Sequence, residues 1–322
     1  MSAVHREGAG APRVASVTLM RNECDIAELF IKINARFLSH MRIVDHHSND
    51  ATARIVQSLQ AQGYPVSYQA WPELTFQQSR TITALCRELA ASGCCDYVLP
   101  LDADEFIDEA QWPAWAALAD VPSDAHATVG IRNYCATADR YHEVDAPLFH
   151  LFRPRAHEPW HIPRVVLGRV FAQAAEVTEG NHVALHPHLS TTPVPLDVQL
   201  QHVPFRSSAQ VIAKTIPAAS ALRTKPNRMP GEGAHWEVIA RYIRDRDFQL
   251  KPNELAAMAL FYPANRAANE GNRILTDAPG IGRASDVITM KDEARVDVLR
   301  SFCGAIDLLE QRLLASGERA PS

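Results

Sequence analysis

The stretch "DYVLPLDADEF" (residues 96–106) joins an apolar run to three closely spaced carboxylates. Residues 97–101 have the composition of a buried strand, and the run stops abruptly at Asp102, Asp104 and Glu105. Like charges this close resist ionisation unless positive charge lies between them. We therefore expect either a solvated turn in which the carboxylates fan out into water, or a cation that holds them together.

The chain before this stretch predicts a regular alternation of strands and helices. Apolar, β-branched runs indicate strands, and apolar residues at the helical period indicate helices. The expected strands are residues 13–20, 41–46, 64–71 and 97–101, and the expected helices are residues 25–38, 51–63 and 77–93. This order is typical of an α/β fold with a Rossmann-like, mostly parallel sheet flanked by helices.

Three expected strands end in polar clusters. These clusters are Arg21-Asn22-Glu23, residues 45–50 ("DHHSND"), and residues 102–105 ("DADE"). Ligands of open α/β sheets bind beyond the carboxyl ends of the strands, so all three clusters are expected at one edge. Any one of them alone is more typical of a helix cap or a solvated turn.

The pattern changes after residue 110. A short helix is expected at residues 111–121, then strands of a less regular, antiparallel region at 127–136, 148–153 and 164–171. Residues 208–262 indicate helices, and residues 291–315 indicate a final amphipathic helix whose plain interpretation is surface packing. We expect a catalytic domain at residues 1–245 and a mainly helical extension at residues 246–322.

Composition excludes several classes of protein. Hydrophobic residues make up 47% of the 322 residues and charged residues 21%, which does not fit a disordered chain. A net charge of −5 does not suggest a nucleic-acid partner. The six cysteines match no zinc spacing and are expected to be reduced. With no apolar signal region or transmembrane segment, the expectation is a cytoplasmic protein, with peripheral association at the inner membrane face left open.

Asp102-Ala103-Asp104 is an Asp-x-Asp pattern, whose two side chains can point the same way from an extended segment. Hard divalent cations take oxygen ligands and keep positions open for water and phosphates. The pattern alone is weak, because taken by itself it is more typical of a solvated turn. Its place after the fourth strand of a nucleotide-binding-like sheet favours a metal, and Glu105 is expected to bond nearby backbone or orient the pair.

Residues 202–214 ("HVPFRSSAQVIAK") could form the second half of such a site. Ser207 and Gln210 have the spacing of a capping box at a helix start, where free N–H groups favour anions. Arg206 precedes this start, and Lys214 follows Ser207 by about two turns. We expect both cations to face a diphosphate; the alternative is a basic helix start on the surface.

The quoted motifs resemble those of nucleotide-sugar-dependent glycosyltransferases with a GT-A fold. "MRNECDIAELFIKINARFL", "RIVDHHSNDAT" and "DYVLPLDADEF" are similar to the family-2-like branch that resembles family 92, and "EGNHV" (179–183) and "HVPFR" extend the resemblance over residues 14–240. His46 and Ala51 depart from it, where the family has Asn and Gly. The resemblance implies metal-dependent, inverting transfer of a sugar from a UDP-sugar to an acceptor hydroxyl of a glycan or other molecule, as in polysaccharide biosynthesis.

The resemblance and the local chemistry together give a set of expected site residues. Mn²⁺ or Mg²⁺ would be held by Asp102, Asp104 and His202. The donor would be held by Arg21, Asn22, Glu23, Asp45, Asp102, Arg206 and Lys214. The acceptor would meet His182 and Trp236, although Trp236 fits core packing equally well. Candidates for the general base are Glu179 and Glu237, with Glu232 and His235 also considered.

Two other functions remain open at this stage. Haloacid-dehalogenase-type phosphatases also place Asp-x-Asp after a strand, but usually after the first strand and followed by Thr or Val. Here the motif follows the fourth expected strand and precedes Glu105, which argues against that class. A non-catalytic nucleotide- or sugar-binding module is the third hypothesis.

Overall fold

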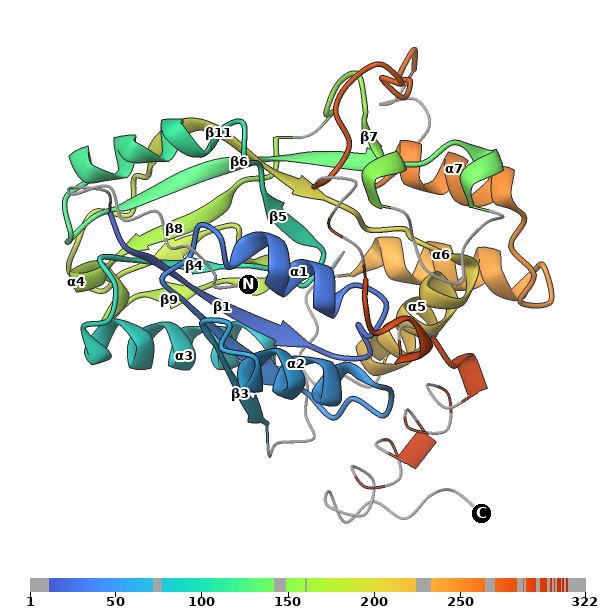
Figure 1. The fold of residues 1–322 in the computed structure, drawn as a ribbon, viewed down its shortest axis with the longest axis horizontal. Helices are drawn as coiled ribbons and strands as arrows, with labels where there is room; N and C mark the ends of the chain where they lie inside the picture. The colour runs from blue at the N-terminus through green and yellow to red at the C-terminus, as the bar shows by residue number, and fades with distance from the viewer. Residues whose placement is uncertain are drawn as a thin grey trace.

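The computed structural model describes residues 12–71, 77–141, 149–159, 161–223, 233–263 and 270–282, with shorter stretches up to residue 311. Within this part the main sheet has the order β3-β2-β1-β4-β8-β6-β11-β5, with β7 paired to β6 (Figure 1). The strands of this sheet are β1 (Val14–Met20), β2 (His40–Asp45), β3 (Val66–Ala70), β4 (Tyr97–Pro100), β5 (Glu105–Ile107), β6 (His126–Cys135), β7 (Arg153–Pro154), β8 (Arg164–Gly168) and β11 (Val194–His202).

The first half of the sheet is parallel. β1 pairs in parallel with β2 and β4, and β2 pairs in parallel with β3. The connecting helices are α1 (Ala27–Asn34), α2 (Thr52–Ala61) and α3 (Gln78–Ser92), which ends at Gly93 in the left-handed conformation. The expected α/β class, a Rossmann-like sheet flanked by helices, is confirmed by this topology.

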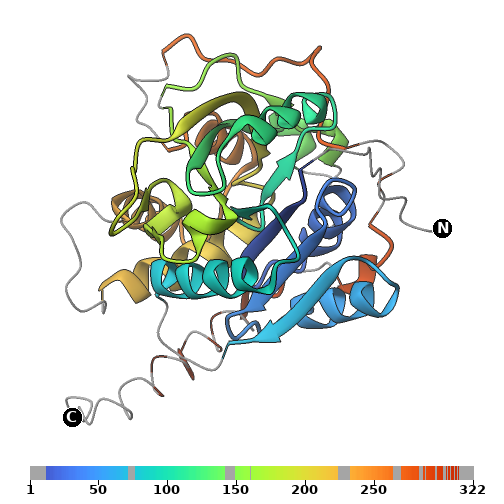
Figure 2. The ribbon, with the colours of Figure 1, turned by 90° about the vertical axis from the view of Figure 1, so that its left-hand side faces the viewer.

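Each face of the sheet has its own core. Val14, Met41 and Leu99 pack with α1 and α2, whereas Val17 and Val98 pack with α3. Successive side chains of a strand point to opposite faces, so the apolar runs supply both cores at once. α3 accordingly lies across the sheet from α1 and α2 (Figure 2).

The second half is mixed and corrects two expectations. β8 is antiparallel to β4 and β6, as expected, and β11, which the sequence did not predict, runs parallel to β6. Residues 148–153 were expected to form a strand; a 3₁₀ turn, Phe149–Leu151, occupies this place instead, followed by the two-residue β7. The expected strand at 164–171 stops at Gly168, because the Ser123 carbonyl accepts the N–H groups of Val170 and Phe171 and starts α4 (Arg169–Ala172).

The two-residue strands β9 (Glu176–Val177) and β10 (Ala184–Leu185) form a separate small sheet. A 3₁₀ helix spans Trp112–Asp120, where a short helix was expected.

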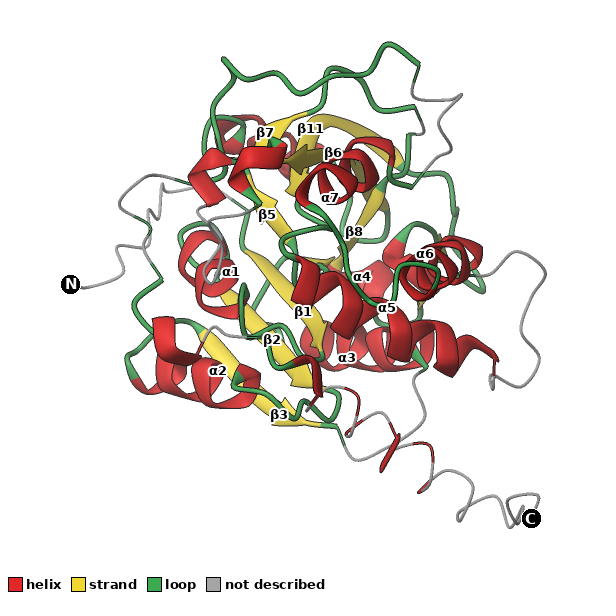
Figure 3. Cartoon of the chain, turned by 90° about the vertical axis from the view of Figure 1, so that its right-hand side faces the viewer, coloured by secondary structure: helices red, strands yellow, loops and turns green. Residues whose placement is uncertain are grey.

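Helices α5 (Ser208–Arg223), α6 (Ala234–Arg244) and α7 (Pro252–Phe261) confirm the helical expectation for residues 208–262. They lie beyond the carboxyl ends of the parallel strands and face the viewer in Figure 3. The expected final helix is described only in part, and its described residues between 298 and 311 are helical. The domain division at residue 245 stays a prediction. No helix among the described residues is long and apolar enough to cross a membrane.

Glu28 ties α1 to a distant segment of the chain. This carboxylate is 1% exposed, accepts the N–H groups of Thr289 and Met290 at 2.9 Å, and pairs with Lys32. Burial opposes its ionisation, but these partners outweigh burial and lower the pKa of Glu28 below its usual value of 4.5.

Glu28→Gln is expected to lower the free energy of unfolding by about 1–3 kcal/mol at neutral pH, because buried donors lose a charged acceptor. Since the pKa of Glu28 is lower in the folded state, its contribution is complete above pH 4.5 and disappears as the pH falls through the folded-state pKa. Urea unfolding of the wild-type protein and the variant, at neutral pH and at a pH below the folded-state pKa of Glu28, checks this. Glu88→Gln, at a side chain 65% exposed, is the control and should change little. A Glu28→Gln difference that stays constant with pH would contradict the assignment.

Candidate functional site

Five carboxylates and three cations meet at the carboxyl ends of β1 and β4. The acids are Glu23 and Asp25 after β1 and Asp102, Asp104 and Glu105 after β4; the cations are Arg164, Arg206 and Lys214. If all of them are ionised, this group carries two excess negative charges. Four of the acids are buried, and the side chain of Asp102 is 32% exposed. The strand-end clusters therefore meet at one edge, as the sequence predicts.

Arg206 is the central cation of this group. Its side chain is 0% exposed, and its guanidinium donates to Asp25 at 2.7 and 3.0 Å and to Glu23 at 2.5 Å. Its Nη1 lies 3.7 Å from Asp104. Arg206 was expected to face a ligand, but its guanidinium instead donates its hydrogen bonds to acids inside the protein. Contact between Arg206 and a donor stays a prediction.

Lys214 reaches the same acids from α5 but keeps 31% of its side chain exposed. Its Nζ lies 2.9 Å from Asp104 Oδ2 and 3.1 Å from Glu23 Oε1. Burial opposes ionisation of Asp104, yet Lys214, His202 and Arg206 outweigh it and hold the pKa of this carboxyl well below its usual range. Burial raises the pKa of Glu23, against the effect of Lys214 and Arg206.

Arg164 pairs with the other two acids. Its Nη2 lies 2.7 Å from Asp102 and 2.5 Å from Glu105. Glu105 also accepts the backbone N–H of Asp102 at 3.0 Å, so it closes the Asp-x-Asp turn and orients the pair, as expected. The carboxylates of Asp102 and Asp104 thus face different cations, which removes the repulsion that their spacing creates.

His202 approaches Asp104 from the end of β11. Its Nε2 lies 3.5 Å from Asp104 Oδ1, and its Nδ1 lies 2.8 Å from Asn133 Oδ1. The first distance is too long for a strong hydrogen bond. It does suit two ligands of one cation with bonds of about 2.1 Å.

The turns after β1 and β2 are locked together by hydrogen bonds. Asn22 N–H donates to Ser48 Oγ at 2.9 Å, and Asn49 N–H donates to Asn22 Oδ1 at 3.0 Å. Glu23 N–H donates to Thr52 Oγ1 at 2.9 Å. The expected donor residues Asn22 and Glu23 therefore belong to a rigid edge, and the neighbouring Arg21 is half-buried.

Asp45 ends β2 at this edge. It accepts Ser48 N–H at 3.3 Å and Tyr68 O–H at 3.2 Å, and burial raises its pKa. Its role toward a nucleotide stays a prediction.

The start of α5 forms as the sequence predicts. Ser207 Oγ accepts the N–H of Gln210 at 3.1 Å, and Gln210 Oε1 accepts the N–H of Arg206 at 3.1 Å. Ser207 caps the helix as predicted, whereas Gln210 bonds the N–H of Arg206 in place of that of Ser207. The second bond fixes the backbone that carries Arg206 into the site.

A turn between β9 and β10 covers Asp102. Asn181 Nδ2 donates to Asp102 Oδ1 at 3.2 Å, and Arg164 donates to the carbonyl of Gly180 at 2.7 Å. His182 lies against Arg164, and burial together with that cation lowers the pKa of His182. Glu179, a candidate base, lies exposed on this turn.

The candidates on α6 lie at a different border of the site. The ring of His235 is 5.7 Å from that of Tyr262, which is 6.1 Å from that of His202. Burial lowers the pKa of His235, and burial together with Asp104 raises the pKa of Tyr262 to about 12. Trp236 and Glu237 are half-buried on the same helix, and Glu232 lies outside the described residues. The roles of these candidates stay predictions.

The arrangement fits a divalent cation at Asp104 and His202 but does not gather the full expected ligand set. Across the described ranges, no group of three or more His, Cys, Asp or Glu side chains is placed to hold a metal. Asp102 is turned toward Arg164 and Asn181. To bind a metal ion, Asp102 would have to give up its contacts with these two residues, so its role as a ligand stays a prediction. Oδ1 of Asn181 is buried with no hydrogen-bond partner among the described residues, which leaves an acceptor unused beside Asp102.

Several residues of the site are not singled out in the sequence, although Asp25 and Asn181 lie inside the quoted motifs. They are Asp25, Asn133, Glu158, Arg164, Asn181 and Tyr262. Two of them could have been noticed in the sequence as polar residues in apolar strands. Arg164 begins the apolar run "RVVLG", and Asn133 lies inside "GIRNYCA".

Comparisons with known proteins give only distant likenesses. No family model matches the chain, and no curated protein matches it significantly. Among solved structures it is similar to the mannosyltransferase PcManGT from Pyrobaculum calidifontis in complex with GDP-Man and Mn²⁺, with TM-score 0.37 and 13% identity over 94% of this chain and 89% of that one. S. aureus TarS 1-349 gives TM-score 0.37 and 10% identity over 96% and 93%.

GalNAc-T7 with UDP, GalNAc and Mn²⁺ also gives TM-score 0.37 and 10% identity, over 80% of this chain and 57% of that one. At these scores and identities the likenesses are too weak to support a conclusion about the function of this chain. The function is therefore argued from the geometry of the site.

Arg206→Met is expected to lower the free energy of unfolding by about 3–5 kcal/mol, because Asp25 and Glu23 lose their buried partner. Chemical denaturation measures this. Arg13→Met is the matched control: Arg13 pairs with Asp96 but is 53% exposed, so its loss should cost about 1 kcal/mol or less. Equal effects of the two substitutions would contradict a structural role for Arg206.

Proposed function

We propose that this protein is a GT-A-type glycosyltransferase. It transfers a sugar from a nucleotide-diphosphate sugar, most simply a UDP-sugar, to an acceptor hydroxyl with the help of Mn²⁺ or Mg²⁺. The observation that carries the proposal is the negative edge of the sheet, where Asp104 and His202 face each other at 3.5 Å among five carboxylates and three cations. The sequence motifs at residues 21–23, 45–50 and 102–105 support the same function.

The charge of the edge explains why a cation would bind there. A mostly buried space with five carboxylates and three cations favours a divalent cation, and Asp104 is held ionised by its neighbours. Asp104 and His202 would hold the ion, leaving its other positions for water and the donor diphosphate. When bound, the ion would neutralise charge on the departing diphosphate.

The remaining donor contacts would come from the chain itself. Lys214, the partly exposed cation, would approach the phosphates, while Arg206 holds Glu23 and Asp25 in place. Asn22, Glu23 and Asp45 form the rigid edge that would hold the base and ribose.

The acceptor side is proposed at the two borders of the site formed by the β9–β10 turn and by α6. His182 and Trp236 would contact the acceptor, and inversion would require a base that takes the hydroxyl proton on the far side of the sugar. Glu179 and Glu237 are the proposed carboxylate candidates. His235 is a third, since burial lowers its pKa and keeps it neutral and able to accept a proton.

Asp104→Asn should reduce Mn²⁺-dependent hydrolysis or transfer of a UDP-sugar by about 10²-fold or more, since it removes the charge of the central ligand. Release of UDP measures the activity, and circular dichroism checks that the variant folds. Asp197→Asn, at an exposed position of β11, is the matched control and should retain activity. Full activity of Asp104→Asn would contradict the assignment of Asp104 as a metal ligand. Release of phosphate from simple phosphate esters, without turnover of a UDP-sugar, would favour a phosphatase.

A further inference from the structure

His202 is held by a chain of polar groups that comes from outside the acid cluster. Asn133 Oδ1 lies 2.8 Å from His202 Nδ1, and Asn133 Nδ2 donates to Glu158 Oε2 at 2.8 Å. The backbone N–H of Asn133 donates to Glu158 Oε1 at 2.7 Å. Both Asn133 and His202 are buried, at 5% and 8% exposure.

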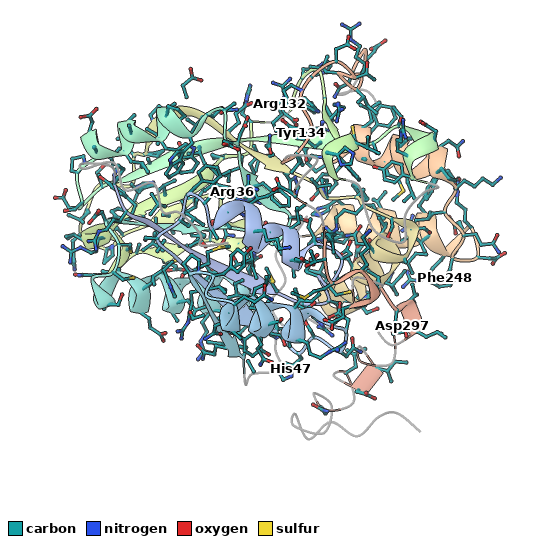
Figure 4. All side chains as sticks on the ribbon, in the orientation of Figure 1. Arg36, His47, Arg132, Tyr134, Phe248 and Asp297 are labelled. Atoms are coloured by element: carbon teal, nitrogen blue, oxygen red, sulfur yellow. The ribbon has the colours of Figure 1, made fainter. Side chains whose placement is uncertain are left out.

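Glu158 is itself fixed by a fully buried arginine. Arg155 Nε donates to Glu158 Oε1 at 3.3 Å, and Nη2 of the same side chain pairs with Oε2. Arg155 also donates to the carbonyl of Leu260 at 3.0 Å and to that of Tyr262. From β6, Arg132 (labelled in Figure 4) donates to the Arg155 carbonyl at 3.0 Å, so the arginine is anchored at both ends.

The chemistry of these groups fixes a proton at Nδ1 of the His202 ring. An ionised carboxylate only accepts hydrogen bonds, so the amide nitrogen of Asn133 has to face Glu158. The amide oxygen then faces His202, and because this oxygen only accepts, Nδ1 of His202 has to carry a proton. In the neutral ring, Nε2 is left with its lone pair directed toward Asp104, 3.5 Å away.

We infer that Glu158, acting through Asn133, sets His202 in the Nδ1–H tautomer so that Nε2 presents its lone pair beside Asp104. Glu158 and Asn133 are positioning residues, because the fixed tautomer and ring orientation are what a cation-binding imidazole requires. The value of this arrangement for catalysis rests on the proposed function. The tautomer itself does not, and it can be measured in the metal-free protein.

The test is the ¹⁵N spectrum of the His202 ring in metal-free, ¹⁵N-labelled protein, with the pH raised until the ring carries a single proton. Signals of His202 are identified by their loss in His202→Gln. The inference predicts Nδ1 protonated and Nε2 bare. A neutral ring protonated at Nε2 and bare at Nδ1 would overturn it.

An exchange of carboxylate and amide gives the sharper test. In Glu158→Gln, the new amide can donate to Asn133, whose own amide is then free to turn its nitrogen toward His202; Nε2–H should appear. The double variant Asn133→Asp/Glu158→Gln keeps the shape and net charge of the pair and again presents an acceptor to His202. It should restore the proton to Nδ1.

Glu176→Gln, at an exposed position of β9, is the matched control and should leave the His202 signals unchanged. Thermal unfolding shows whether each variant is folded, and the wild-type spectrum decides the tautomer even if Glu158→Gln does not fold. If Glu158→Gln folds and keeps the wild-type tautomer, the link through Asn133 is refuted.

Mn²⁺ binding separates this inference from the proposed function. With both correct, Glu158→Gln should weaken Mn²⁺ binding by about 10- to 100-fold, and the double variant should recover most of it. The predicted tautomer in a wild-type protein that does not bind Mn²⁺ would support the positioning chain and overturn the metal-dependent function. The Nε2–H tautomer in a wild-type protein that binds Mn²⁺ would overturn the positioning chain and support the metal-dependent function.

Discussion

The constraint on which the site depends is charge balance in a mostly buried space. A parallel sheet delivers the ends of β1 and β4 to the same edge, and here each end carries acids. Four of those acids are buried, so the fold needs cations within contact distance. Arg206 and Lys214 come from the start of α5 and Arg164 from β8, which fixes where these later elements have to pack.

The balance remains incomplete on the acidic side. Arg206 pairs with Glu23 and Asp25 and also lies 3.7 Å from Asp104, and Arg164 pairs with Asp102 and Glu105. Lys214 is shared by Asp104 and Glu23. Five carboxylates therefore share three cations, which is a surplus of two acids. A cation that arrives with a diphosphate would remove this surplus, which links the stability of the edge to the function that we propose.

The parallel half of the fold can be predicted from the sequence because the apolar residues of each segment recur with the period of either a strand or a helix. The meeting of the polar strand ends at one edge then follows from the parallel order of the strands. The mixed half does not: β8 ends at Gly168 because of the Ser123 carbonyl, a contact that no local pattern reveals. Arg206 looked like a ligand-facing cation, since its acidic partners lie about 180 residues away in sequence. Asn133 and Glu158 likewise act only through tertiary contacts.

Backbone geometry shows that the edge is held under constraint. Five non-glycine residues of the described chain have positive φ, and three of them, Asn22, His47 and Asn181, lie in the turns around the site. Such conformations are unfavourable for these residues and persist only where surrounding bonds enforce them. The bonds of Asn22 to Ser48 and Asn49, and of Asn181 to Asp102, supply that enforcement.

Calorimetric titration of UDP with and without Mn²⁺ tests the central claim most directly. If the ion lies between Asp104, His202 and the diphosphate, each ligand must tighten the binding of the other by the same factor, about 5- to 150-fold for a typical coupling. The account predicts this reciprocal gain in the wild-type protein and its loss in Asp104→Asn. UDP binding that is absent, or equally strong with and without the metal, would contradict it.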